Sequence, residues 1–328
     1  MIQHLEDGRA VPGPGQYDMS MDHYHSQACC PGPSVSSTGL RTIYHQSAAD
    51  FWAFSELNDN RFEKEASEAF TFGRAAHALL LGDEDFDAKF AVVPDDAPPK
   101  PLDSQWAMLA AGRKLTDSAA ERLGFWRPFL EANKGKELLS QSDLKHIKHI
   151  GENLARHPIV PVLMEGEAEQ SLIWQDEKTG LWVKSRLDIL SSTGDLADLK
   201  STVMIEPRRI KKSIGEHGYD MQLGLATMAL ENVLGVPFNT EVYASRAAIL
   251  LFVYKRPPYH VTPVELSFDA LHHARLKCRF ALDRLADCII KNEWPGPSDG
   301  ILNWDTPEWE VEKIAESQAA GLFPTVMT

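Results

Sequence analysis

Apolar and polar residues alternate in two neighbouring stretches of the chain, 181–190 and 196–202, and this period of two predicts β-strands. The five residues between them, SSTGD at 191–195, are typical of a turn that closes a hairpin. If Leu190 pairs with Leu196, the two strands form an antiparallel pair of fixed register. The sequence then predicts which side chains this pair brings together.

In that register Asp188 lies opposite Asp198, and Arg186 lies opposite Lys200. Like charges directly across two strands are destabilising unless a group between them compensates. A divalent cation with hard oxygen ligands, Mg²⁺ or Mn²⁺, would do so. Lys200, on the same face as Asp198, would point its ammonium group at whatever the metal holds, which suits phosphodiester hydrolysis. An Asp-x-Lys sequence in a strand is common without any function, and it is the second aspartate in register that favours the catalytic interpretation.

The remaining periodic segments include both helical and strand patterns. The helix expected at 268–291 carries one apolar stripe, as a helix that covers a sheet does. The helix expected at 219–234 is followed by Gly235, a common residue at helix ends. Together the segments predict an α/β fold with a central mixed, partly antiparallel sheet flanked by helices. The other expected helices lie at about 37–52, 67–81, 105–133 and 138–157, and the other expected strands at 171–175, 247–254 and 259–266.

The two ends of the chain differ from its middle. Residues 1–35 are rich in Gly, Pro and Ser and show no periodicity, which predicts a flexible, extended or partly disordered amino-terminal arm. A Pro-Gly-Pro sequence ends the pattern of helices and strands, and residues 295–328 form an acidic tail. One domain with a helical amino-terminal part, 36–294, is expected between them.

Composition is that of an ordinary globular protein, with 43% hydrophobic and 24% charged residues. The longest apolar run, 247–253, is too short to cross a membrane, and the first residues resemble no secretory signal. A cytoplasmic protein without membrane association is therefore expected. The cysteines, at positions 29, 30, 278 and 288, show no disulfide or metal-binding spacing and are interpreted as free thiols.

Charge is unevenly distributed along the chain. The formal net charge of −14 argues against a protein that coats nucleic acid indiscriminately, but not against an enzyme that holds DNA locally. Residues 200–212 contain five basic residues against one acid, whereas residues 293–316 contain seven acids and one lysine. Four of these basic residues are expected to contact DNA phosphates: Arg208, Arg209, Lys211 and Lys212.

Several short motifs follow one another in a recognisable order and spacing. They are SSTGL at 36–40, FGRAAHALLL at 72–81, EQS at 169–171, Trp174, Asp176, TG at 179–180, RLD at 186–188, DLKST at 198–202 and the segment 219–222. With these motifs the sequence resembles the exonuclease VIII (RecE-type) family of the PD-(D/E)xK nuclease superfamily, which also includes lambda exonuclease and RecB-type nuclease domains. The resemblance covers about residues 17–294. Leu187 stands where the superfamily usually has proline, a difference that removes no ligand.

The resemblance implies a restriction-endonuclease-like nuclease core with one metal site. By spacing alone His77 would more often be a core residue of its helix, but the family's histidine lines the metal site. The hairpin register leaves Glu169 opposite either Leu187 or Asp188, and only the second register brings its carboxylate to the metal. Glu165 and Glu167 are near alternatives, so the choice of Glu169 rests mainly on the resemblance. The implied metal ligands are Asp188, Asp198, the main-chain carbonyl of Leu199 and His77. Lys200 would activate or orient the attacking water, and Glu169, Tyr219 and Gln222 would complete the site.

The activity implied is Mg²⁺-dependent hydrolysis of linear double-stranded DNA, with Mn²⁺ as an alternative metal. Degradation would run from 5′ ends, in phage-type recombination beside a single-strand annealing protein. Two relatives act as rings that thread DNA, so a closed homo-oligomer is expected here. Two alternatives remain open: a structure-specific or restriction-type endonuclease on the same core, and a catalytically inactive DNA-binding or scaffold protein.

Overall fold

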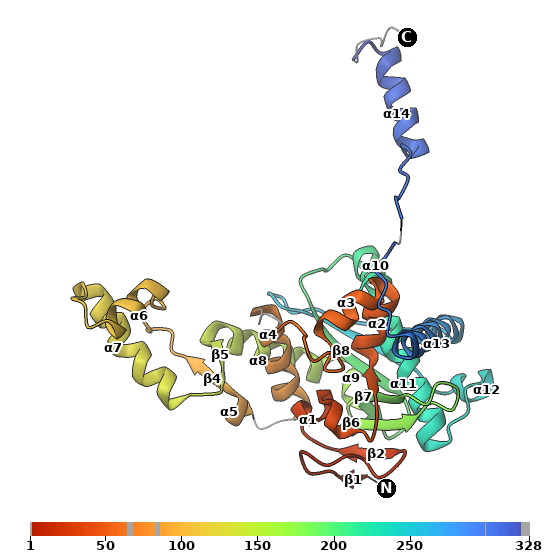
Figure 1. Cartoon of the computed structure of the whole chain (residues 1–328), viewed down its shortest axis with the longest axis horizontal. Helices are drawn as coiled ribbons and strands as arrows, with labels where there is room; N and C mark the ends of the chain where they lie inside the picture. Colours follow the sequence, from red (N-terminus) through yellow and green to blue (C-terminus); the bar gives the residue numbers. More distant parts are fainter. Residues whose placement is uncertain (1, 64–67, 83–85, 299, 323–328) are drawn as a thin grey trace.

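The centre of the molecule is a mixed β-sheet with helices on both faces (Figure 1). The computed structural model describes residues 2–63, 68–82, 86–298 and 300–322, and only the backbone of 68–70. Within these residues, eight strands are arranged in the order β1-β2-β6-β7-β8-β9-β10, with β3 beside β7. The fold class is therefore α/β with a partly antiparallel sheet, as predicted. The strands are β1 (Gln3–His4), β2 (Gly15–Asp18), β3 (Ser34–Ser36), β6 (Gly166–Gln175), β7 (Trp182–Ser191), β8 (Leu196–Thr202), β9 (Ala248–Tyr254) and β10 (Val261–Glu265).

Two apolar cores lie on opposite faces of this sheet. Helices α2, α11 and α13 enclose the first core, and α4, α8 and α9 enclose the second. The short strands β4 (Phe90–Val93) and β5 (Glu137–Ser140) form a separate pair, from which α6 and α7 project away from the body (Figure 1). The helices are α1 (Met21–His25), η1 (Gln27–Cys29), α2 (Ser37–His45), α3 (Ala48–Phe54), α4 (Glu68–Leu81), α5 (Phe86–Lys89), α6 (Asp103–Ala110), α7 (Asp117–Ala132), α8 (Gln141–Arg156), α9 (Val160–Leu163), α10 (Pro207–Glu216), α11 (Tyr219–Leu234), α12 (Thr240–Tyr243), α13 (Phe268–Lys291) and α14 (Glu308–Ala319).

Strand β7 has an edge that two other strands share. Its first edge pairs with β6 over most of its length, so β3 and β8 must both use the second edge. There β3 pairs in parallel with residues 182–184 and β8 pairs antiparallel with residues 189–190. Between them, β7 has no ladder partner on this edge over residues 185–188 in the described part of the chain. The fork between β3 and β8 positions the candidate site.

The amino-terminal segment is part of the folded body, which corrects the expectation of a flexible arm. Strand β2 pairs with β6, and β3 pairs with β7. Tyr17 and Cys29 are fully buried in a third apolar cluster with Ile173 and Trp182 of the sheet. The strands of this segment are only two to four residues long, which is too short for a period of two to show in the sequence.

Most of the longer elements lie where the sequence predicts them. Helices α11 and α13 have the expected bounds, and the pairing of Leu190 with Leu196 is confirmed. The helix expected at 105–133 is instead two helices, α6 and α7, separated by a turn at 111–116. The helix expected at 67–81 corresponds to α4, and residue 67 itself lies outside the described residues.

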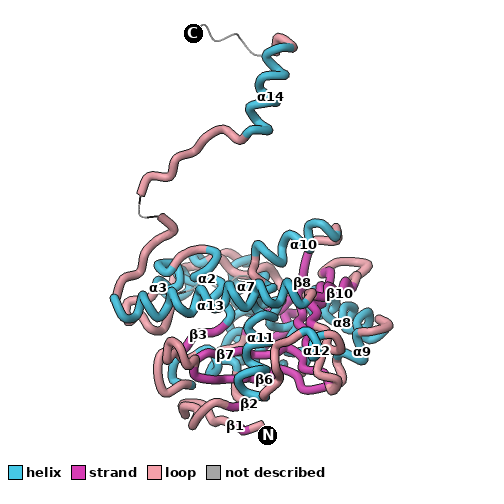
Figure 2. The backbone as a smooth tube through the Cα atoms, turned by 90° about the vertical axis from the view of Figure 1, so that its right-hand side faces the viewer, coloured by secondary structure: helices cyan, strands magenta, loops and turns pink. Residues whose placement is uncertain are grey.

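The carboxyl-terminal segment leaves the body after α13. Figure 2 shows α14 at the end of an extended linker, away from the sheet and its helices. Its side chains include exposed Trp309 and Val311. Among the described helices, none combines the length and the apolar character needed to cross a membrane.

Candidate active site

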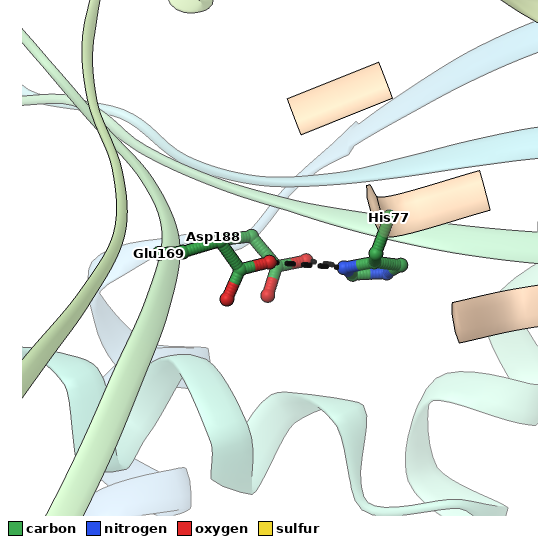
Figure 3. Close-up of side chains that lie close together, drawn as sticks. All are labelled: His77, Glu169 and Asp188. Atoms are coloured by element: carbon green, nitrogen blue, oxygen red, sulfur yellow. Dashed lines mark hydrogen bonds and ion pairs between the residues drawn. The ribbon is translucent and has the colours of Figure 1, made fainter. Parts of the chain in front are cut away.

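Three ligand-type side chains meet at the open stretch of β7: His77 from α4, Glu169 from β6 and Asp188 from β7 (Figure 3). Their candidate ligand atoms all lie within 4.8 Å of one another. His77 Nδ1 is 3.2 Å from Glu169 Oε1, and His77 Nε2 is 3.8 Å from Asp188 Oδ2. Both carboxylates are buried, and the imidazole is partly exposed. The arrangement could hold one cation at the inner end of an open space.

The position of Glu169 resolves the register that the sequence left undecided. Ala168 pairs with Ile189 and Gln170 pairs with Leu187, so Glu169 lies opposite Asp188. Its φ of 53° is in the left-handed region, which is costly for a residue with a side chain and occurs most often at functional sites. The irregular backbone allows the Glu169 carboxylate to turn toward His77 rather than into the apolar core.

Asp188 marks the point where β7 and β8 separate. Ladder pairing between the two strands is limited to Leu190 with Leu196 and Ile189 with Ala197. The next backbone donor of β8, the amide of Leu199, donates instead to Asp188 Oδ2 over 2.8 Å. The expected pairing of Arg186 with Lys200 is therefore wrong. Arg186 Nε instead donates to Glu169 Oε2 over 2.9 Å.

Asp198 forms a second cluster beside the first, with Lys200 and Gln222. Gln222 Nε2 donates to Asp198 Oδ1 over 2.5 Å, and Lys200 Nζ lies 2.5 Å from Asp198 Oδ2. The Lys200 ammonium also stands 5.2 Å from the centre of the Tyr219 ring, within the range of a cation–π interaction. Lys200 and Gln222 thus contact one buried carboxylate, and Tyr219 lies against Lys200.

The two clusters interact electrostatically. Burial, followed by the charge of Asp188, raises the pKa of Asp198 to about 6. Burial also raises the pKa of Asp188, although His77 and Lys200 oppose this. Burial alone would lower the pKa of His77, but Asp188 and Glu169 outweigh it and raise that pKa to about 9. His77 is therefore an imidazolium at neutral pH and donates from Nδ1 to Glu169 and from Nε2 to the carbonyl of Leu199, 3.2 Å away.

The donor set fits a divalent cation. Three buried carboxylates within one small region are compensated by Arg186, the imidazolium of His77 and Lys200. A divalent cation would take over the charge compensation that the His77 proton supplies, which leaves the imidazole free to act as a ligand. Moreover, Asp198 Oδ2 is buried and has no hydrogen-bond partner among the described residues, although Lys200 is in ion-pair contact with it. Carboxylate oxygens of this kind suit Mg²⁺ or Mn²⁺.

A cleft of about 650 Å³ gives access to the site. His77, Leu199, Lys200 and Tyr219 are among its lining residues. Gly73 also lines it and faces open space, since a Cβ at this position would meet nothing within 4 Å. The cationic lining is unusual for a chain of net charge −14. It comprises Arg41, Arg74, Lys200 and Lys255, with Glu216 as the one acid among the described lining residues.

Arg41 is the site residue that sequence reasoning missed. It lies on α2, directly after β3, and its guanidinium donates to the carbonyls of Ser37 and His217. Burial lowers its pKa, and the charge of Asp198 opposes that effect. Only the pairing of β3 with β7 brings Arg41 to the cleft, and no local pattern predicts that pairing.

The other predicted residues lie where their elements place them. Arg208, Arg209, Lys211 and Lys212 are exposed on α10, and none of them lines the cleft. Lys212 forms an exposed ion pair with Glu216. The four cysteines are free, as predicted.

A comparison with known protein families assigns the chain to one of them. The family model described as a PDDEXK-like domain of unknown function, DUF3799, matches residues 36–303. The chain belongs to this family. DUF3799 places it in the PD-(D/E)xK nuclease superfamily. Among curated proteins, no sequence is significantly similar to this member of the family.

One solved structure agrees with this assignment at the level of the fold. A protein from Eubacterium rectale assigned as an exonuclease superimposes with a TM-score of 0.54 and 13% identity, over 89% of this chain and 97% of that one. A phage-related exonuclease from Haemophilus somnus 129PT has 13% identity over 60% of this chain and 92% of that one, but a TM-score of only 0.29. The first superposition supports a shared nuclease-type fold for this DUF3799 chain.

Proposed function

We propose that this chain is a metal-dependent deoxyribonuclease that degrades linear double-stranded DNA. The observation that carries the proposal is the convergence of His77, Glu169 and Asp188 beside the cluster of Asp198 and Lys200, next to a cationic cleft that His77 and Lys200 line. The family assignment and the resemblance to exonuclease VIII point the same way. We further propose that degradation runs from 5′ ends. It would serve phage-type recombination, with a single-strand annealing protein as partner.

The residues have separate roles in hydrolysis. His77, Glu169 and Asp188, with Asp198 and the Leu199 carbonyl, would hold Mg²⁺ or Mn²⁺. When bound, that cation would supply Lewis acidity at the phosphoryl oxygen and acidify a water molecule.

Two side chains of the second cluster, Lys200 and Gln222, would act on the attacking water and on the Asp198 carboxylate. Lys200, held between Asp198 and the Tyr219 ring, would orient the attacking water and offset charge that develops on the phosphate. Gln222 would keep the Asp198 carboxylate in place through its hydrogen bond.

The cationic residues would position the DNA backbone. Arg41, Arg74 and Lys255 line the cleft and would contact phosphates close to the cut bond. The exposed arginines and lysines of α10 would contact phosphates farther along the duplex. Because these cationic side chains gather at the cleft and on α10, the chain would bind DNA there despite its net charge of −14.

Time-resolved digestion of an end-labelled linear duplex in Mg²⁺ or Mn²⁺ tests the proposal. We expect the wild type to shorten the duplex, and Asp198→Asn to lower the rate by about 10² or more because the replaced carboxylate is charged only in the wild type. Glu167→Gln is the matched control, since Glu167 lies on β6 two residues from Glu169 but is exposed. A wild type that leaves linear duplex intact in both metals would indicate the inactive binding or scaffold protein.

Covalently closed circular DNA separates the exonuclease from the endonuclease. An enzyme that needs ends consumes linear DNA and spares the circle. Cutting of the circle at a comparable rate would instead establish the endonuclease alternative.

A further inference from the structure

A second cavity, of about 850 Å³, opens beside the cleft and has no role in the hydrolysis described above. The two cavities share one wall, formed by Thr38, Thr42 and Gln46 at the helical spacing of four residues along α2 and its end. The two cavities are therefore neighbours along α2, and a strand of nucleic acid in the cleft would lie next to the second cavity.

The chemistry of the second cavity differs from that of the cleft. Among the residues that the structure describes, its charged lining comprises three acids and two bases: Asp50, Glu56, Glu63, Arg61 and Lys184. Arg61 is paired with Glu56, and buried Lys184 donates to the carbonyl of Ser26. Such a lining does not attract phosphates as the cationic cleft does. It suits neutral groups that carry hydrogen-bond donors and acceptors.

Two phenylalanine rings stand at this cavity with much of their surface accessible. Phe54 ends α3 and Phe62 lies in the following loop, and their exposed fractions are 43% and 69%. Their ring centres are 6.2 Å apart. The backbone fixes their separation, because the amide of Phe62 donates to the carbonyl of Ala53 over 2.8 Å. Exposed aromatic rings beside a cationic groove are the features on which unpaired bases stack.

We propose that this cavity is a binding site for unpaired nucleobases of the strand whose backbone runs through the cleft. Phe62, with Phe54, provides the stacking surface, and the hydroxyl and amide groups of the lining accept or donate hydrogen bonds to base edges. The inference rests on the proposed function, and it adds that the enzyme holds its DNA with the end unpaired beside the active site.

Binding of a fluorescein-labelled oligothymidylate, followed by fluorescence anisotropy, tests the site. All proteins carry Asp198→Asn so that hydrolysis does not interfere. Phe62→Leu keeps an apolar side chain but removes the ring, and it is expected to weaken binding about tenfold, a typical loss for one stacked base. Phe62→Trp keeps a ring and is expected to bind within about twofold of the parent.

Phe280→Leu is the matched control, because Phe280 is 58% exposed on α13 and lines neither cavity. It should bind the oligonucleotide like the parent. The inference is overturned if Phe62→Leu and the double variant Phe54→Leu/Phe62→Leu, both with unchanged thermal unfolding, bind as tightly as Phe280→Leu. If these two variants unfold at a lower temperature, quenching of a 2-aminopurine base by Phe62→Trp decides: no change in fluorescence on binding overturns the inference.

Digestion of duplex by the chain with Asp198 intact separates this inference from the proposed function. If the chain with Asp198 intact hydrolyses duplex but Phe62→Leu binds the oligonucleotide as tightly as its parent, only the stacking site is overturned. Loss of oligonucleotide binding in Phe62→Leu without any hydrolysis would support the stacking site and overturn only the nuclease.

Discussion

At the scale of single residues, the site is a balance of three buried carboxylates against three cations. Glu169 forms an ion pair with Arg186, and Asp198 forms one with Lys200. Asp188 lies between His77 and the Leu199 amide. Burial of an unpaired carboxylate costs several kcal/mol, so each of these pairings is needed for the fold as well as for chemistry. Arg186 is the partner that stands outside the cluster of candidate ligands, which allows its contribution to be measured separately.

Replacement of Arg186 by methionine should strongly destabilise the protein. Arg186 and Glu169 have side-chain exposures of 8% and 5%, and the change removes the guanidinium from a buried carboxylate, which keeps its contact with His77. We expect the free energy of unfolding to fall by about 3–5 kcal/mol, as measured by urea denaturation. Lys178→Met is the control, because Lys178 forms an exposed ion pair with Asp283 and should cost at most about 1 kcal/mol. Equal losses for both variants would contradict the assigned role of Arg186.

At the scale of elements, the turn between β6 and β7 is fixed to α13 by Asp176. Arg279 donates to both carboxylate oxygens of Asp176, over 2.6 and 3.1 Å, and Thr179 donates to the same group within the turn. Burial raises the pKa of Asp176, but these donors outweigh it and hold the pKa below its usual value. The hairpin that carries Glu169 and Asp188 is therefore anchored at its far end.

This anchoring should depend on pH in a defined direction. Because the pKa of Asp176 is lower in the folded state, its stabilisation is fully present above about pH 4, the usual pKa, and is lost as the pH falls further. Asp176→Asn should lower the free energy of unfolding by about 1–2 kcal/mol at pH 7, and the difference from wild type should shrink below pH 4. Denaturation curves between pH 7 and pH 3 measure it, with exposed Asp305→Asn as control. A difference that stays constant with pH would contradict the assignment.

Local pattern predicted the elements whose signals are local. The stripe of α13, the glycine after α11 and the register of Leu190 with Leu196 all depend on neighbouring residues, and all are confirmed. The amino-terminal strands were missed because they are short, and β2 and β3 pair with partners about 150 residues away. Arg41 was missed for the same reason. The place of Glu169 was left undecided because a difference of one residue in turn length changes its partner.

At the scale of the whole molecule, the distribution of charge favours assembly. A chain of net charge −14 holds DNA weakly as a monomer, whereas copies arranged around a channel would bring their cationic clefts and α10 helices together. We therefore propose a closed homo-oligomer. Light scattering at working concentration should give a multiple of 36.6 kDa. A mass of one chain under those conditions would contradict the ring.

The central claim is that one bound cation joins His77, Glu169 and Asp188, and titration with Mn²⁺ followed by electron paramagnetic resonance tests it most directly. Wild type and the control Glu167→Gln should bind Mn²⁺ with equal affinity. Glu169→Gln and Asp188→Asn should each bind it at least about tenfold more weakly, because each removes a charged oxygen ligand. Unchanged Mn²⁺ affinity in both ligand variants, with the proteins folded, would contradict the metal site.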